Sequence, residues 1–96
     1  MLQKSEEAYH LSQIASMYNY TGNKLKANEC YERALTIYKE TGNKMAQATI
    51  MNNKAALLHS IGQRDQALKM VESAEKLSQE TGRKDLRYFL PYKFIL

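Results

Sequence analysis

Two histidines and one cysteine are the residues of this chain whose chemistry could support a metal site or a nucleophile. Neither His10 nor His59 has a Cys, His or Asp at metal-ligand spacing on the same helical face, so we expect no metal site and interpret His59 as a polar face residue. Cys30 stands beside Tyr31, and we expect a packed or half-buried thiol, because a reactive thiolate needs a base and an electropositive setting. A lone cysteine forms no intramolecular disulfide, which favours a reducing, cytoplasmic setting.

Two Gly-Asn-Lys turns, at Gly22 and Gly42, could be interpreted as phosphate-binding loops. Both follow predicted helices rather than strands, and neither has the further glycines that cradle a phosphate, so we reject that interpretation. The neighbouring carboxylates Glu6 and Glu7 are explained by ordinary surface charge on a helix. The sequence therefore predicts a protein that is not an enzyme and that uses no cofactor.

Composition and charge restrict the class of protein further. With 96 residues, 44% hydrophobic and 25% charged, the chain suits one folded domain and is too apolar for a disordered tail. No apolar run approaches the roughly 18 residues that span a bilayer, so we expect no membrane association. Residues 1–82 carry 10 basic and 9 acidic residues, and the rest of the +4 charge comes from Arg83, Lys84, Arg87 and Lys93 against Asp85. We therefore do not expect a nucleic-acid-binding face spread over the domain.

The elements that position all of these residues follow from the glycines, which fall at 22, 42, 62 and 82, a constant spacing of 20. Between them lie segments rich in Ala, Leu, Lys, Glu, Gln and Met and free of proline, which favour helices. A glycine directly after each segment is typical of a left-handed C-terminal cap. We predict four helices of similar length joined by tight turns.

Segments 40 residues apart match each other better than adjacent segments do. The matched positions are Leu11, Ala15, Tyr18, Ala27, Tyr31, Ala34 and Tyr38 in the first copy and Met51, Ala55, Leu58, Ala67, Val71, Ala74 and Ser78 in the second. The unit is therefore a helical hairpin that occurs twice. The alanines are expected where two helix backbones approach closely, with the larger residues filling the space beside them.

The pattern Leu11-x-x-Ile14-Ala15-x-x-Tyr18, followed by Ala27, Tyr31 and Ala34, resembles the tetratricopeptide repeat. The second copy matches less fully, because Lys54 stands where a large apolar residue is usual. The family's usual unit has about 34 residues. The longer unit here looks like the repeats of kinesin light chain, spindle adaptor proteins and bacterial peptide-pheromone receptors.

The resemblance implies an all-α fold of two stacked antiparallel helical hairpins, an α-solenoid, plus a C-terminal capping or extension segment. We expect a single domain or fragment over residues 1–96, with repeat 1 at about 3–42, repeat 2 at about 43–82 and a C-terminal segment at 83–96.

The resemblance also implies that the first helix of each repeat lines a concave, peptide-binding surface. Carried onto this sequence, its positions are Tyr9, Ser12, Gln13, Ser16 and Asn19 in the first repeat and Thr49, Asn52, Asn53, Ala56 and His59 in the second. Amide side chains both donate and accept hydrogen bonds, which suits the backbone of an extended peptide. Many relatives place an Asn that holds the peptide at the position of Asn53. Ser12 and Ser16 stand where the carboxylate-clamp subclass has Lys and Asn, so we do not expect that clamp. A solvated face, or contacts with a neighbouring helix, would explain Asn52 and Asn53 equally well.

The C-terminal segment is unusually apolar, and Pro91 would break a further helix. Seven of its last nine residues are large and apolar: Tyr88, Phe89, Leu90, Tyr92, Phe94, Ile95 and Leu96. The segment could cap the second repeat, begin a further repeat of a longer protein, or pair with a second copy. Of these accounts, we favour a fragment or a self-associating chain.

Three functional hypotheses follow. The leading one is a non-catalytic module that binds a protein or an extended peptide, as an adaptor or as the ligand-sensing segment of a larger regulator. The alternative is a homodimerisation module that uses the apolar C-terminal segment and the exposed repeat ends. The third, binding of RNA or an acidic surface by the basic C-terminal cluster, is weaker than the interpretation of that cluster as solvated charge.

Overall fold

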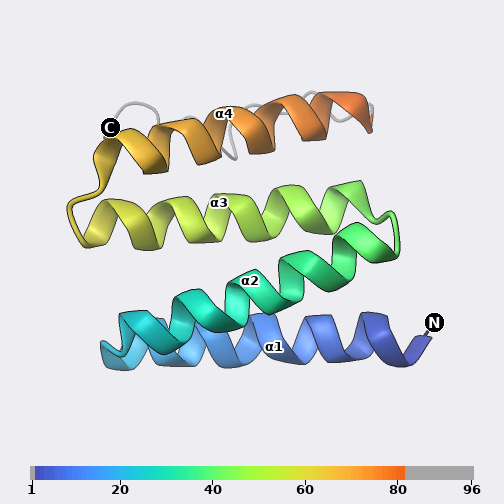
Figure 1. Cartoon of the computed structure of the whole chain (residues 1–96), viewed down its shortest axis with the longest axis horizontal. Helices are drawn as coiled ribbons and strands as arrows, with labels where there is room; N and C mark the ends of the chain where they lie inside the picture. Colours follow the sequence, from blue (N-terminus) through green and yellow to red (C-terminus); the bar gives the residue numbers. More distant parts are fainter. Residues whose placement is uncertain (1, 82–96) are drawn as a thin grey trace. The chain divides into compact units, whose positions relative to one another are not determined.

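Four α-helices make up residues 2–81, the part of the chain that this computed structural model describes (Figure 1). They are α1 (Leu2–Thr21), α2 (Lys24–Glu40), α3 (Lys44–Ser60) and α4 (Arg64–Glu80). α1 has 20 residues and each of the others has 17, which confirms the prediction of four helices of similar length. The fold is all-α. The predictions for residues 83–96, including the seven apolar residues expected to self-associate, lie outside the described residues.

The turn between α1 and α2 shows why a Thr-Gly-Asn sequence ends one helix and starts the next. Gly22 has a φ of +91°, a left-handed conformation that side-chain-bearing residues rarely adopt. In this conformation the Gly22 N–H donates to the Asn19 carbonyl over 3.2 Å, and the Asn23 N–H donates to the Tyr18 carbonyl over 2.8 Å. The Asn23 side chain then caps α2 by accepting from the Lys26 N–H over 3.3 Å. One three-residue turn thus closes α1 and opens α2.

The same turn recurs after α2 and α3. Gly42 and Gly62 also have positive φ, of +72° and +86°. The N–H groups of Asn43 and Gln63 reach back to the carbonyls five residues earlier, over 3.0 and 2.9 Å. The predicted glycine caps are therefore confirmed at the three turns within the described residues.

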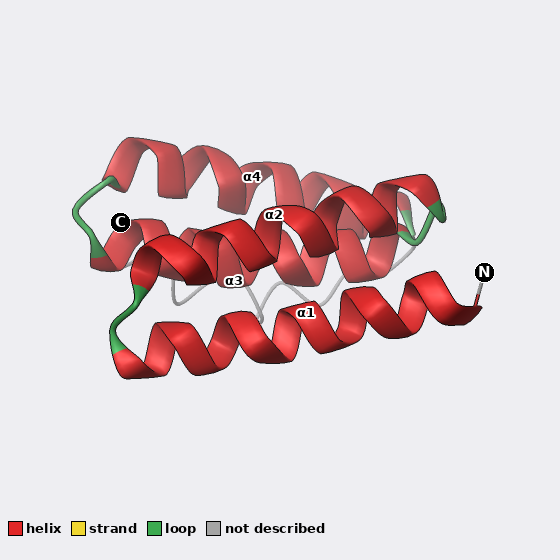
Figure 2. Cartoon of the chain, turned by 60° about the horizontal axis from the view of Figure 1, so that its bottom comes forward, coloured by secondary structure: helices red, strands yellow, loops and turns green. Residues whose placement is uncertain are grey.

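α1 and α2 form an antiparallel hairpin (Figure 2), and small residues fill the seam between them. The seam alanines Ala8, Ala15, Ala27 and Ala34 are fully buried. The larger Leu11, Tyr31 and Tyr38 fill the space beside them and are at most 8% exposed. The structure confirms the prediction that these alanines lie where the backbones approach.

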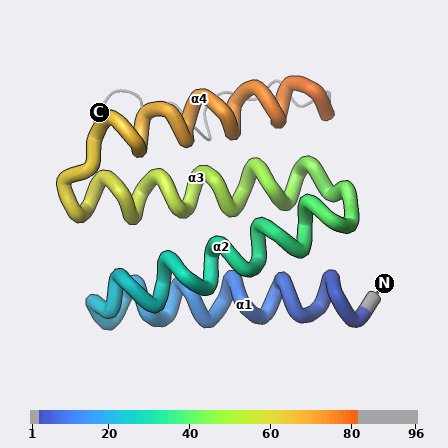
Figure 3. Tube along the Cα trace, viewed as in Figure 1, coloured from blue at the N-terminus to red at the C-terminus, as the bar shows by residue number. Residues whose placement is uncertain are grey.

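α3 and α4 form a second hairpin from the corresponding positions (Figure 3). Its core is a cluster of Ala48, Ala55, Leu58, Ala67, Val71 and Ala74, with Met51, Met70 and Leu77 packed against it. Most of these residues stand 40 positions after a seam residue of the first hairpin. The chain divides into two compact units after Asn43, and each unit contains one hairpin.

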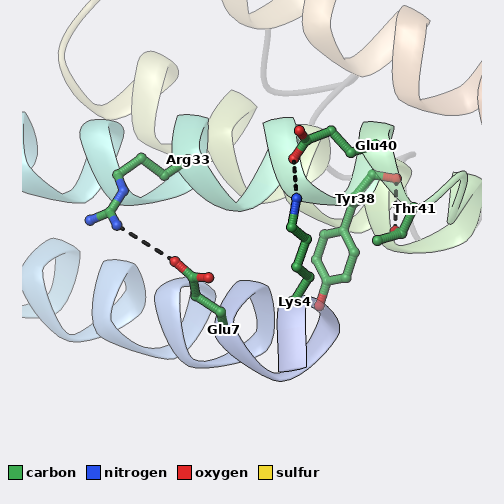
Figure 4. Close-up of polar contacts among 6 residues, drawn as sticks. All are labelled: Lys4, Glu7, Arg33, Tyr38, Glu40 and Thr41. Atoms are coloured by element: carbon green, nitrogen blue, oxygen red, sulfur yellow. Dashed lines mark hydrogen bonds and ion pairs between the residues drawn. The ribbon is translucent and has the colours of Figure 1, made fainter. Parts of the chain in front are cut away.

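Ion pairs connect the free ends of each hairpin, and Figure 4 shows the pair of the first hairpin, Lys4 with Glu40. Lys4 on α1 contacts Glu40 on α2 over 3.8 Å. Lys44 on α3 contacts Glu80 on α4 over 4.0 Å, and these two residues stand 40 positions after the first pair. All four side chains are about half exposed, so each pair contributes at most about 1 kcal/mol to stability. The pairs mark the point where the end of the second helix returns to the start of the first.

The two hairpins differ in the exposure of their first helix, on the face that points away from the seam. On α1, Ile14 and Met17 are 42% and 68% exposed. On α3, Ile50 and Leu57 occupy the corresponding face and are 2% and 1% exposed. We call these the outward faces of α1 and α3. Ile14, the second large residue of the sequence motif, therefore lies on a partly exposed apolar surface.

Candidate interaction surface

The five first-repeat residues predicted to bind a partner lie together on α1, and we call them the α1 stripe. They are Tyr9, Ser12, Gln13, Ser16 and Asn19. Their spacing of three and four residues places them on one side of the helix, beside the buried seam residues Ala8 and Ala15. None of the five is buried.

Most polar groups of the α1 stripe are already hydrogen-bonded within the first hairpin. The Ser12 hydroxyl donates to the Tyr9 carbonyl over 2.6 Å. The Ser16 hydroxyl lies 3.3 Å from the Tyr31 hydroxyl. The Asn19 side-chain oxygen accepts from the Lys24 ammonium. These contacts fix the stripe in place and leave fewer of its groups open to a ligand.

Two of these contacts involve residues that sequence reasoning did not assign to the surface. Lys24 begins α2, and its ammonium also reaches the Asn19 carbonyl over 3.4 Å. Tyr31 was predicted only as a core residue, and it is 3% exposed while its hydroxyl meets Ser16. The tight turn at Gly22 is the signal that could have found both, since it brings the start of α2 back along the end of α1.

The five second-repeat residues lie on one side of α3, and we call them the α3 stripe. They are Thr49, Asn52, Asn53, Ala56 and His59. Thr49 is exposed, and its hydroxyl donates to the Met45 carbonyl over 3.1 Å. Asn53, Ala56 and His59 are half-buried. Asn52 differs from the rest, because its residue is only 2% exposed.

Asn52 and His59 each hold a buried polar atom that has no hydrogen-bond partner among the described residues. The Asn52 Oδ1 and His59 Nδ1 atoms are buried and make no hydrogen bond to any of the described residues. The sequence placed both on an open polar surface, whereas the structure places these two atoms out of solvent. Asn28 Oδ1 on α2 is buried without a partner among the described residues in the same way, so this state is not specific to the α3 stripe.

Amides at one repeated position, Gln13 and Asn53, are the groups best placed to contact a ligand. The two residues stand 40 positions apart. Gln13 is exposed and Asn53 is half-buried, and neither side chain hydrogen-bonds within residues 2–81. Each amide offers donors and an acceptor on an uncharged stripe.

The charged depression along the first hairpin is a weaker candidate site. It is lined by Lys4, Glu7, Arg33, Thr36, Ile37 and Glu40. Its charges compensate one another, since Lys4 pairs with Glu40 and Arg33 with Glu7 over 3.8 Å each (Figure 4). Such a depression presents no net charge to a ligand.

One titratable group in the first hairpin is clearly perturbed. Burial, and secondarily the nearby phenol of Tyr9, raises the pKa of the Tyr38 hydroxyl above its ordinary value of 10.0. A raised phenol pKa keeps the group neutral at physiological pH, which suits its position in the seam. The shift reflects packing rather than activation of the hydroxyl.

Residues 2–81 contain no cluster of three or more His, Cys, Asp or Glu side chains that could hold a metal ion. Within the same residues, no helix is long and apolar enough to cross a membrane. Cys30 is half-buried, as predicted.

Comparison with known proteins identifies a repeat family that matches the four helices. The model of the tetratricopeptide repeat family matches residues 6–80, which cover all four helices almost completely. Neither the curated proteins nor the solved structures contain a match to the chain.

Proposed function

The chain belongs to the tetratricopeptide repeat family, and we propose that it binds an extended peptide segment of a partner protein through the α1 and α3 stripes. Repeats of this family are non-enzymatic and generally mediate protein–protein interaction. The finer proposal is a cytoplasmic adaptor, or the ligand-sensing segment of a larger regulator, built from the longer repeat form.

The observation that carries this proposal is the repeated amide position, Gln13 and Asn53. Neither amide side chain forms a hydrogen bond within residues 2–81. By contrast, the hydroxyls of Ser12 and Thr49 donate hydrogen bonds to backbone carbonyls of their own helices. Because the stripes carry no formal charge, recognition would rest on hydrogen bonds to peptide backbone and on contacts with Tyr9 and Ala56.

The test starts from a display library of random linear peptides, selected on the immobilised 96-residue chain. The dissociation constant of the best peptide is then measured by fluorescence anisotropy for the wild type, Gln13→Ala and Asn53→Ala. Each change removes about 0.5–1.5 kcal/mol of hydrogen bonding, so we expect affinity to fall by about two- to tenfold per substitution.

The matched control is Gln66→Ala, which removes an exposed amide from α4, away from both stripes. Its affinity should equal that of the wild type. Failure to select any peptide, or a double variant Gln13→Ala/Asn53→Ala that binds as tightly as the control, would overturn the proposal.

A second candidate function, self-association, is favoured by the outward face of α1. Ile14 and Met17 are substantially exposed there, and Tyr20 and Leu25 near the first turn are 92% and 72% exposed. Ile14 and Met17, three residues apart, share one face of α1, and exposed apolar side chains on one helix face are typical of an interface. The occupant we propose is a second copy of the chain.

Light scattering over a concentration series tests this second function. We expect a concentration-dependent dimer for the wild type and a monomer for Met17→Glu, because a charge at the interface would have to be desolvated. A wild-type monomer at all concentrations, or a Met17→Glu dimer of unchanged strength, would exclude the α1 face as the interface.

A further inference from the structure

The outward face of α1 carries apolar side chains in its middle and an acidic group at one end. His10, Ile14 and Met17 follow one another at spacings of four and three residues, so they lie on one side of the helix. His10 is exposed, and Ile14 and Met17 are 42% and 68% exposed. Glu6, four residues before His10, is also exposed and extends this side toward the start of α1.

A lysine from α2 supplies a positive charge at the other end of this face. The Lys26 ammonium lies 5.7 Å from the centre of the Tyr18 ring, which holds it against the end of α1. Glu6 and Tyr18 are twelve residues apart, about 18 Å along the helix axis. The neighbouring carboxylate of Glu7 is already paired with Arg33 over 3.8 Å. Neither Lys26 nor Glu6 forms an ion pair within residues 2–81, so both charges are available to a partner.

The second hairpin does not repeat these two charges. Ala46 and Gln66 stand there at the positions of Glu6 and Lys26. The outward face of α3 is buried, with Leu57 only 1% exposed. The opposite charges therefore flank the outward face only in the hairpin where that face is exposed to a partner.

We propose that a second copy of the chain packs antiparallel on this face, about a two-fold axis that crosses α1 between residues 10 and 14. Lys26 of each copy then lies opposite Glu6 of the other, and Ile14 of each packs against His10 of the other. A parallel pairing would instead place like charges opposite each other, which is unfavourable. The arrangement rests on the self-association proposed above and specifies which residues of the two copies meet.

The test measures the dimer dissociation constant of the full 96-residue chain by sedimentation equilibrium at low ionic strength. Each dimer contains two contacts between Lys26 and Glu6, so Lys26→Glu or Glu6→Lys turns two attractions into two repulsions. We expect either substitution to weaken the dimer by at least about tenfold. The double variant Lys26→Glu/Glu6→Lys exchanges the charges and restores both attractions. Its dissociation constant should return to within about threefold of the wild-type value.

The matched control is Lys69→Glu, which makes the same change in net charge at an exposed position of α4. It should leave the dissociation constant unchanged. A negative charge in the first turn of α2 interacts favourably with the helix dipole, so Lys26→Glu should fold as the wild type does. Circular dichroism checks this.

Three results would overturn the antiparallel pairing and leave self-association standing. They are a wild-type dimer that Lys26→Glu leaves unchanged, a double variant as weak as either single variant, and an equal loss in Lys69→Glu, which net charge alone would explain. A wild-type monomer at every concentration would overturn the pairing together with the self-association on which it rests.

Discussion

The outward faces of α1 and α3 lie on the same side of two copies of one hairpin, yet both their residues and their surroundings differ. Met17 aligns with Leu57, whereas Ile14 aligns with Lys54 and Ile50 with His10. α3 is buried on two sides, at the α4 seam and at Ile50 and Leu57. α1 is buried at its α2 seam, while Ile14 and Met17 remain largely exposed. The comparison teaches that repetition of a sequence pattern reproduces the seam of the hairpin, because the seam forms within each copy. It does not reproduce the environment of the opposite face.

The largest expected effect comes from truncating that face in each hairpin. Leu57→Ala removes a side chain that is 1% exposed and should lower the free energy of unfolding by about 2–5 kcal/mol. Met17→Ala truncates the corresponding side chain of α1, which is 68% exposed. This substitution should change the free energy of unfolding by no more than about 0.5 kcal/mol. Urea unfolding followed by circular dichroism measures both. Equal losses in the two variants would contradict the comparison.

Substitutions in the turns should cost similar stability in the two hairpins, in contrast to substitutions on the outward faces. Gly22 and Gly62 close α1 and α3 with φ values of +91° and +86°, and a Cβ built on either meets no atom within 4 Å. Alanine would therefore be strained only by its backbone conformation, which costs about 1 kcal/mol at each site. Thermal unfolding of Gly22→Ala and Gly62→Ala should show similar losses. Asn tolerates the left-handed conformation better, so Gly22→Asn should be milder. A cost at only one of the two sites would show that the turns are not equivalent.

The smallest expected effect is a difference between the two hairpins in how their stability depends on pH. Tyr38 occupies the seam position that Ser78 occupies in the second hairpin, and burial raises the pKa of Tyr38 in the folded state. The unfolded chain therefore loses this proton at a lower pH than the folded chain does. The stability contributed by the neutral phenol is complete below the unfolded pKa of about 10 and is lost as the pH rises through the folded value.

Unfolding experiments across that alkaline range should show a steeper loss of stability for the wild type than for Tyr38→Phe, which has no proton to lose. A Ser78→Ala variant serves as the control in the second hairpin and should follow the wild-type slope. Identical pH profiles for the wild type and Tyr38→Phe would mean that the seam does not hold the phenol neutral.

Much of the fold could be predicted from local signals. The glycine spacing predicted the helices and turns because a left-handed cap depends on a few adjacent residues. The seam alanines were predictable because close helix packing tolerates few other residues at those positions. The ion pair between Lys4 and Glu40 was not, since it depends on where two helices meet rather than on sequence spacing.

The candidate surface was predictable only in part. The spacing correctly grouped each stripe on one side of its helix. It did not indicate that Asn52 is buried while its neighbour Asn53 is half-buried. An asparagine is predicted to be exposed from its residue type alone, whatever packs against it. Exposed repeat ends were expected, but the sequence did not identify Ile14 and Met17 as the residues exposed there.

The most direct test of the account maps a selected peptide onto the full chain by NMR titration. Binding through the stripes predicts amide shift changes concentrated around Gln13 on α1 and Asn53 on α3, with exposed α2 and α4 positions such as Thr36 and Gln66 unaffected. Shift changes confined to α2 and α4, or to the outward face around Ile14 and Met17, would contradict the claim that the amide stripes bind the peptide.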